Sequence, residues 1–287
     1  MNLISFVDDC IANYGKNGDD SLEFIGLVIN QEKICTKRAY RKKGQALDLE
    51  LATGFPYLQA MRILSNFISM NGVKVCDISL DSSNGEKLAR IDFLLPSQLP
   101  HEMEQQYLEK FFVGSGIKAT EAGVTRYLDI FSRINSTEYS PLFQLGAEIT
   151  DAGMIVGVKY YLNFGPGSIA SREKKCFTYL LETKKPIEVS KRLNMMGYYP
   201  AFIGINERQN EIEEKLYFRS RAFGHQTQDI LPNSSAISKY LGWDIILPEY
   251  FFEQLWERNI YLEGIALSFL HPTVWRLYFS ALPRTQV

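Results

Sequence analysis

Three segments of the chain repeat one arrangement, in which a cation is followed two residues later by a tyrosine. They are Lys159-Tyr160-Tyr161, Lys215-Leu216-Tyr217 and Arg276-Leu277-Tyr278. Because side chains alternate between the two faces of a β-strand, each cation lies on the same face as its tyrosine. After the second segment, Arg219 and Arg221 extend the cationic face. A row of cations repels itself unless an anion lies over it, so the pattern predicts a bound phosphate or diphosphate.

The tyrosines of these segments, Tyr161, Tyr217 and Tyr278, predict a second kind of contact. Aromatic faces stabilise a neighbouring cation through the ring quadrupole. An allylic diphosphate that ionises leaves a carbocation, which needs such faces and the exclusion of water. A single tyrosine of this kind is more often a half-buried strand residue with a solvated hydroxyl. Its repetition in three segments, each time beside a cation, indicates prenyl transfer.

The elements that must position these residues are hairpins. Hydrophobic spacing predicts five β-hairpins separated by helices, with turn signals such as Ser83-Asn84-Gly85. The hairpins are expected at residues 21–41, 72–96, 141–164, 199–223 and 260–281. Helices are expected at residues 2–14, 54–71, 101–113, 119–134, 171–182, 186–196, 234–241 and 248–258.

Hairpins make an antiparallel sheet, so the expected fold class is α+β. Ten antiparallel strands can close into a barrel, which removes the exposed edges. Apolar residues such as Val158 and Leu162 alternate with polar ones, so the apolar face is expected to pack under a surrounding ring of helices. We therefore predict that residues 1–287 form a single domain, a closed ten-stranded barrel with a polar lumen. The alternative is an open sheet whose polar face meets solvent.

Every hairpin contributes charge to the expected lumen. An unpaired buried charge is costly, and the hairpins carry too few interior acids to pair every cation, so a diphosphate is the expected counter-ion. Arginine can bind two phosphate oxygens at once, while lysine acts as a point charge. The predicted diphosphate ligands are Arg38, Arg90, Lys159, Lys215, Arg219 and Arg276.

The bulk composition excludes several other classes of protein. A net charge of -2 argues against a nucleic-acid binder, and four scattered cysteines indicate reduced thiols. The start of the chain lacks a signal-peptide pattern, and no stretch reaches the roughly 18 apolar residues of a membrane span, so a cytoplasmic protein is expected. Asp8-Asp9 and Asp19-Asp20 lack the third acid of an aspartate-rich magnesium motif. No protein-held metal is therefore expected, and magnesium would be bound through phosphate oxygens.

Several short motifs, in this order of helices and hairpins, resemble those of a known family. Ser21-Leu22-Glu23 is followed by Arg38, and the later segments are Lys159-Tyr160-Tyr161, Leu216-Tyr217 with Arg219 and Arg221, and Arg276-Leu277-Tyr278-Phe279. Together they resemble the ABBA prenyltransferases, whose ααββ repeats form a barrel. Within that group they look like the cyanobactin prenyltransferases, which modify macrocyclic ribosomal peptides.

The resemblance implies dimethylallyl diphosphate as the donor, Mg²⁺ as a helpful ion, a macrocyclic peptide as the partner and Glu23 as the acid–base residue. Tyr161, Tyr217 and Tyr278 would then shield the carbocation. Arg219 and Arg221 stand where the family often has histidine or lysine. A small-molecule aromatic prenyltransferase and a non-catalytic barrel that binds phosphorylated ligands or peptides stay open as alternatives. The accepting side chain and the prenyl length are open as well.

Overall fold

The structure is a computed structural model that describes most of the chain between residues 24 and 281. The described residues are 24–29, 34–40, 56–81, 88–117, 121–134, 139–164, 167–183, 185, 187–208, 211–220, 260–269 and 275–281, the first two ranges by their backbone alone. The predicted helices at 2–14, 234–241 and 248–258 lie outside this part of the chain.

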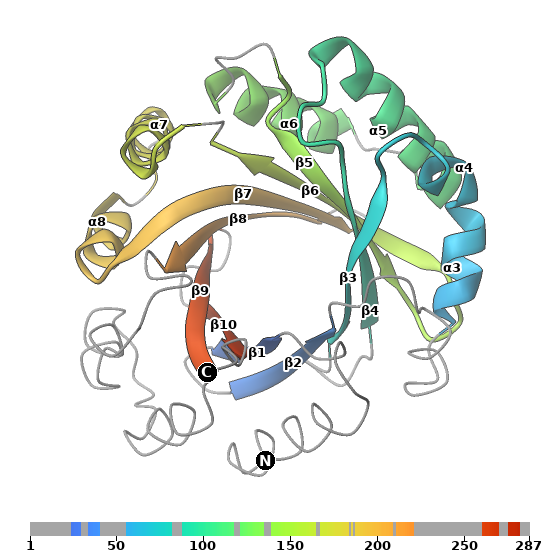
Figure 1. Ribbon diagram of the computed structural model, residues 1–287, viewed down its shortest axis with the longest axis horizontal. Helices are drawn as coiled ribbons and strands as arrows, with labels where there is room; N and C mark the ends of the chain where they lie inside the picture. Colours follow the sequence, from blue (N-terminus) through green and yellow to red (C-terminus); the bar gives the residue numbers. More distant parts are fainter. Residues whose placement is uncertain are drawn as a thin grey trace, which may run out of the picture.

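The described residues include ten strands, which form one antiparallel sheet (Figure 1). Each strand pairs with the strands before and after it, and the first strand also pairs with the last, from Phe24 opposite Ser280 to Ile29 opposite Trp275. The order along the sheet is therefore β1-β10-β9-β8-β7-β6-β5-β4-β3-β2, a closed barrel. The strands are β1 (Phe24–Ile29), β2 (Ile34–Tyr40), β3 (Lys74–Asp81), β4 (Leu88–Leu94), β5 (Leu142–Ile149), β6 (Ile155–Asn163), β7 (Tyr198–Arg208), β8 (Glu211–Ser220), β9 (Ile260–Ser268) and β10 (Trp275–Ala281).

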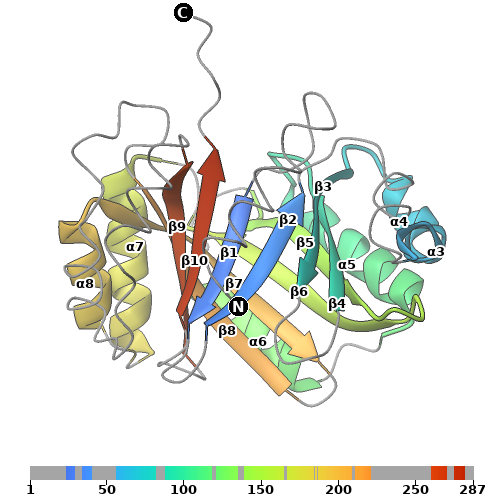
Figure 2. The ribbon, with the colours of Figure 1, turned by 90° about the horizontal axis from the view of Figure 1, so that it is seen from below.

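Six described helices lie outside the strands, along the arc from β3 to β8 (Figures 1 and 2). They are α3 (Tyr57–Ile63), α4 (Ser65–Ile68), α5 (His101–Ser115), α6 (Glu121–Ile134), α7 (Ile169–Glu182) and α8 (Ile187–Met195). None of the helices in the described ranges is long and apolar enough to cross a membrane.

The main hydrophobic core lies between this helical layer and the outer face of the sheet. Val158, Tyr160 and Leu162 on β6 all belong to it, as do Leu277 and Phe279 on β10. These residues alternate with the polar ones along each strand, as the period of a pleated strand requires. The prediction that the apolar face packs under helices is confirmed for the arc from β3 to β8, and the antiparallel α+β architecture is confirmed as well.

One predicted helix differs from the structure. The spacing predicts a continuous helix over residues 54–71, whereas the structure has α3 and α4, which are interrupted at Leu64. Leu64 is fully buried, and its φ of -88° and ψ of 10° lie outside the helical region. Burial of this side chain in the core favours a bend at this position over a straight helix.

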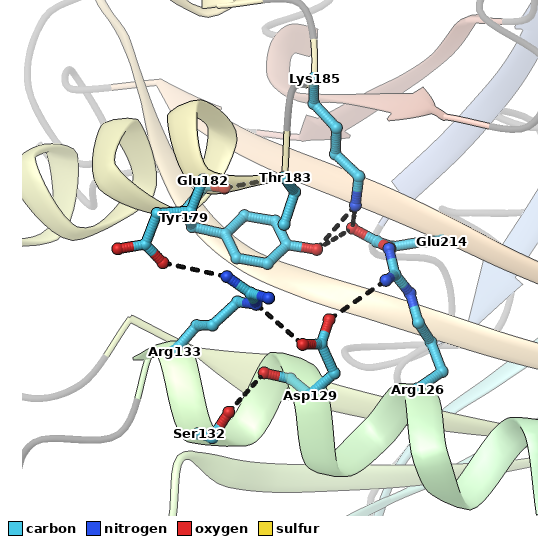
Figure 3. A network of polar contacts seen from close by, with 9 residues as sticks. All are labelled: Arg126, Asp129, Ser132, Arg133, Tyr179, Glu182, Thr183, Lys185 and Glu214. Carbon is cyan, nitrogen blue, oxygen red and sulfur yellow. Dashed lines mark hydrogen bonds and ion pairs between the residues drawn. The ribbon is translucent and has the colours of Figure 1, made fainter.

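A buried acid on the outer face of β8 ties two neighbouring helices to the barrel. Glu214 is 5% exposed and forms ion pairs with Arg126 of α6 and with Lys185, which follows α7 (Figure 3). It also accepts a hydrogen bond from the hydroxyl of Tyr179 on α7. Burial lowers the pKa of Lys185 to about 8, although the charge of Glu214 opposes this effect. The outer face of the sheet is therefore not purely apolar. The buried charges on it around Glu214 form ion pairs with one another.

We expect Glu214→Gln to destabilise the fold, because it leaves Lys185 and Arg126 without their shared buried counter-charge. Removing one partner of a buried pair costs about 3–5 kcal/mol. Urea unfolding followed by circular dichroism measures the loss. Glu182→Gln is the control, since Glu182 pairs with Arg133 at 3.2 Å on the surface and should cost less than about 1 kcal/mol. Equal losses in the two variants would contradict a structural role for the cluster.

Candidate active site

The inner face of the barrel carries charged side chains that are almost completely removed from solvent. Lys159, Lys215, Glu148 and Glu213 are between 4% and 7% exposed. The strand register links their positions around the barrel: Lys159 lies opposite Asn206, which in turn lies opposite Glu213. These residues come from β5, β6, β7 and β8, so tertiary structure brings four strands together to form one charged region.

This region, which we call the ionic layer, is held together by ion pairs. Arg90 Nε lies 2.7 Å from Asp92 Oδ2, and Lys159 Nζ lies 3.1 Å from Glu148 Oε1. Glu213 pairs with two cations, Lys215 at 2.5 Å and Arg276 at 3.2 Å. The ionic layer therefore consists of Arg90, Asp92, Glu148, Lys159, Glu213, Lys215 and Arg276.

The ionic layer has three acids for four cations, so the interior acids are too few for one-to-one pairing, as expected, but no cation of the layer lacks a partner. Arg90, Lys159, Lys215 and Arg276 each have a carboxylate partner. Glu213 lies two residues before Lys215 on the same strand face, so the sequence contained the signal that it was a partner. Positive charge still exceeds negative charge among these described side chains, because Glu213 serves two cations and Glu148 also pairs with Arg208.

Burial and crowding perturb the ionisation of the layer. Burial lowers the pKa of Lys215 well below its usual value, and the neighbouring charges of Arg276 and Lys159 lower it further. Burial also lowers the pKa of Lys159, an effect that Glu148 opposes. For Glu213, burial alone would raise the pKa, but Lys215 and Arg276 outweigh it and bring the pKa to about 2. The acids of the layer are therefore ionised, and a further anion would stabilise the charged forms of the two lysines.

Aromatic rings lie next to these cations, two residues further along the same strands. Tyr161, Tyr217 and Tyr278 follow Lys159, Lys215 and Arg276 on the same faces. Tyr217 stacks on Tyr278 with ring centroids 6.2 Å apart and meets Tyr161 at 5.9 Å. Two further rings join them, and we call the five the aromatic sleeve: Phe143, Tyr161, Phe202, Tyr217 and Tyr278.

The two phenylalanines of the sleeve were not predicted from the sequence. Phe202 stacks on Tyr217 at a centroid distance of 4.5 Å, and Phe143 meets Phe202 edge-on at 5.4 Å. Phe202 occupies an inward position of β7 that alternation could have identified. Phe143 could not be found in this way, because it is the extra residue of a β-bulge: Leu142 pairs with Leu162, and Gln144 pairs with Tyr161.

A cavity of about 100 Å³ lies against the aromatic sleeve. Two of the predicted phosphate ligands, Arg90 and Arg219, line it, and Arg219 lies over the ring of Phe202 at 5.7 Å from its centroid. Lys159, Lys215 and Arg276 do not line the cavity but lie in the ionic layer next to it. Its lining residues are Arg90, Gln144, Tyr161, Phe202, Tyr217, Phe218, Arg219, Glu263, Gly264 and Tyr278.

Two of the predicted site residues are not described in full. Glu23, the predicted acid–base residue, lies outside the described residues, and so does the side chain of Arg38. The backbone of Arg38 pairs with Ile25 and Leu80. Leu80 in turn pairs with Ala89, and Ala89 pairs with Ile149, so Arg38 is not in register with Arg90. The roles assigned to both residues stay predictions.

The described acids do not offer a protein-held magnesium site. Magnesium requires several oxygen ligands in near-octahedral geometry. Within the described ranges, no group of three or more histidine, cysteine or acidic residues could hold a metal ion. Glu148 and Glu213 are instead engaged by lysine and arginine. These residues therefore do not fit a metal bound by the protein alone.

Comparison with known proteins identifies the fold. No family model and no curated protein matches the chain. The crystal structure of AnaPT from Neosartorya fischeri matches with a TM-score of 0.60 and 13% identity, covering 91% of this chain and 78% of that one. The NotF prenyltransferase matches with a TM-score of 0.57 and 12% identity, covering 91% of this chain and 80% of that one. The chain has a prenyltransferase-type fold. At such low identity the likeness extends to the fold alone.

Close packing around Gly204 gives a test of the aromatic sleeve. A Cβ atom at Gly204 would lie 2.8 Å from Cε2 of Tyr217 and 3.4 Å from Cδ1 of Tyr161. We expect Gly204→Ala to displace the Tyr217 ring and to cost about 1–3 kcal/mol. The thermal midpoint and the near-ultraviolet circular dichroism of the tyrosines report this change. In a Tyr217→Leu background the same alanine should cost less, because the clashing ring is gone; an unchanged cost would show that the sleeve is not packed against Gly204.

Proposed function

We propose that this protein is a prenyltransferase that moves a dimethylallyl group from dimethylallyl diphosphate to a side chain of a macrocyclic ribosomal peptide. The observation that carries the proposal is the pairing of the ionic layer with the aromatic sleeve inside one barrel. An isoprenyl diphosphate has the same division, since an anionic head is joined to an apolar tail. The fold of the NotF prenyltransferase provides independent support.

The reaction begins with cleavage of the bond between C1 of the allyl group and the diphosphate oxygen. The electron pair leaves with the diphosphate, whose added charge Arg90, Lys159, Lys215, Arg219 and Arg276 stabilise, with Arg38 as a further predicted ligand. Interactions that strengthen as charge develops lower the barrier. Burial lowers the pKa of both lysines and so disfavours their charged forms. A departing anion next to them stabilises those charged forms.

The allylic carbocation then lies among Tyr161, Tyr217 and Tyr278. The faces of these rings stabilise the positive charge, and the burial of Tyr161 and Tyr217 keeps out water that would capture it. A nucleophilic atom of the acceptor side chain attacks the cation and forms the new bond. The proton that this atom loses passes to a carboxylate, for which Glu23 is the predicted residue.

The proposal that the acceptor is a peptide has its own support. It rests on the resemblance of the first hairpin and the three cation–tyrosine segments to the cyanobactin prenyltransferases. Lys159, Lys215 and Arg276 occupy the ionic layer, while Tyr160, Leu216 and Leu277, which separate the cations from the tyrosines, belong to the helix-facing core. The cations of these motifs thus lie on the inner face of the barrel and the residues between cation and tyrosine lie on the outer face, as a substrate-facing strand requires. A small aromatic acceptor would use the same pocket.

A transfer assay tests the function. The protein is incubated with dimethylallyl diphosphate and cyclic peptides that carry Tyr, Trp, His, Arg or Ser, with and without magnesium, beside a panel of free aromatic compounds. A mass gain of one isoprene unit on a peptide, located by tandem fragmentation, is the expected result. Product on the free aromatic compounds alone would assign the small-molecule activity. Donor binding without any product would indicate a non-catalytic barrel.

Glu23→Gln tests the predicted acid–base residue. The amide keeps the size of the side chain but cannot take up the acceptor's proton, so we expect transfer to fall by about 10²–10⁴-fold. Donor affinity, measured with inorganic diphosphate, should stay unchanged. Turnover equal to that of the unmodified protein would remove Glu23 from the mechanism.

The lowered pKa of Lys215 gives a prediction on proton uptake. A bound diphosphate offsets the charges of Arg276 and Lys159, so the pKa of Lys215 should rise towards its usual value and a proton should bind. Affinity for inorganic diphosphate should accordingly fall as the pH rises. Calorimetry in two buffers of different ionisation enthalpy measures the uptake, and Lys215→Met should reduce it. Equal uptake by the variant would place the diphosphate away from Lys215.

A further inference from the structure

One carboxyl group faces the pocket without belonging to the ionic layer. Of the described residues that line the pocket, Glu263 alone is acidic. It is 7% exposed and shares the pocket with the three tyrosines of the aromatic sleeve. Glu148 and Glu213, the acids of the ionic layer that pair with lysine and arginine, do not line the pocket.

A β-bulge gives Glu263 this position. Leu262 pairs with Phe279 of β10 and belongs to the helix-facing core, whereas Gly264 pairs with Tyr278 and lines the pocket. Glu263 is the extra residue between them and has no counterpart in that ladder. Gly264 faces the interior, so regular alternation would place its neighbour Glu263 on the outer face. The bulge instead turns the side chain of Glu263 inward. Bulges are frequent beside active sites for this reason.

The pocket carries charges of both signs. Arg90 and Arg219 attract an anionic diphosphate, whereas Glu263 repels it and attracts a hydrogen-bond donor or a cation. A carboxylate can accept several hydrogen bonds, so a contact with one neighbour leaves acceptor positions for a ligand. Hydrogen bonds to a charged group are roughly twice as strong as neutral ones. Glu263 is therefore placed to hold the second substrate and not the donor.

We propose that Glu263 is the acceptor-binding residue of the pocket, and that it accepts a hydrogen bond from an N–H or O–H group of the side chain to be prenylated. This inference rests on the proposed function and narrows it. The acceptor class becomes side chains that combine an apolar or planar body with a polar hydrogen, namely phenol, indole, imidazole and guanidinium. The ring lies against the aromatic sleeve, and its polar hydrogen points to Glu263.

Methylated acceptors test the hydrogen bond in a binding experiment that needs no turnover. The protein is saturated with dimethylallyl S-thiolodiphosphate, a donor analogue that ionises poorly. Calorimetry then gives the dissociation constants of cyclic hexapeptides that carry one Tyr or one Trp and of their O-methyltyrosine and 1-methyltryptophan counterparts. We expect the unmodified protein to bind at least one of the parent peptides about 10-fold more tightly than its methylated form.

Two substitutions of Glu263 complete the test. Glu263→Gln keeps a weaker neutral acceptor, so the preference should fall to about 3-fold. Glu263→Ala should abolish it. Glu188→Gln, on the exposed face of α8, is the matched control and should keep the full preference. Affinity for the donor analogue should be the same in all four proteins, which shows that the pocket is intact.

The outcomes separate this inference from the proposed function. If the unmodified protein binds neither parent peptide, or if Glu263→Ala keeps the preference for the parent peptide, the inference is overturned. If the preference behaves as expected but the transfer assay yields no product, the acceptor site stands and the prenyl-transfer proposal fails. If transfer occurs and the preference is unaffected by the alanine substitution, the enzyme stands and Glu263 has no part in acceptor binding.

Discussion

The burial of positive charge inside the barrel is the constraint on which the rest of the structure depends. A lysine such as Lys215 can stay inside a protein only if acids or bound anions offset the loss of its hydration. Glu213 provides part of that offset and serves Arg276 as well. Since the polar faces of the strands are used for these pairs, the apolar faces must point outward and be covered by helices. The inverted polarity of the barrel and its helical layer follow from the same requirement.

The register of the strands divides the interior into two regions. Cation and tyrosine are two residues apart on β6, β8 and β10, which places them one step apart along the same face. Antiparallel pairing aligns these steps between neighbouring strands, so that the ionic layer and the aromatic sleeve become continuous around part of the barrel. Glycines allow this close approach: at Gly204 any side chain would meet the rings of Tyr217 and Tyr161. A ligand with an anionic head and an apolar tail matches this division.

The outer face departs from simple alternation in a way that also supports the barrel. Glu214 and Glu207 are 5% and 2% exposed beneath the helices. Glu207 accepts a hydrogen bond from Tyr160 at 3.0 Å, and Glu214 joins α6 to α7 through Arg126 and Tyr179. Each acid has a partner from another element, and the contacts of Glu214 fix where α6 and α7 lie on the sheet. Hydrophobic burial alone would define their positions less closely.

Local spacing was enough to predict the order of helices and hairpins and the inward placement of Lys159, Tyr161, Lys215, Tyr217, Arg276 and Tyr278. The reason is that a pleated strand has a period of two, which local spacing reveals. Glu213 was equally readable, two residues from Lys215, but was overlooked as a partner. The pairs of Arg276 with Glu213 and of Arg208 with Glu148 could be seen only in the folded chain, since these contacts join strands that are distant in the sequence. The tertiary structure also decided that Phe143 and Glu263 face the interior: a bulge adds one residue and reverses the alternation, and its position depends on the register of the paired strand.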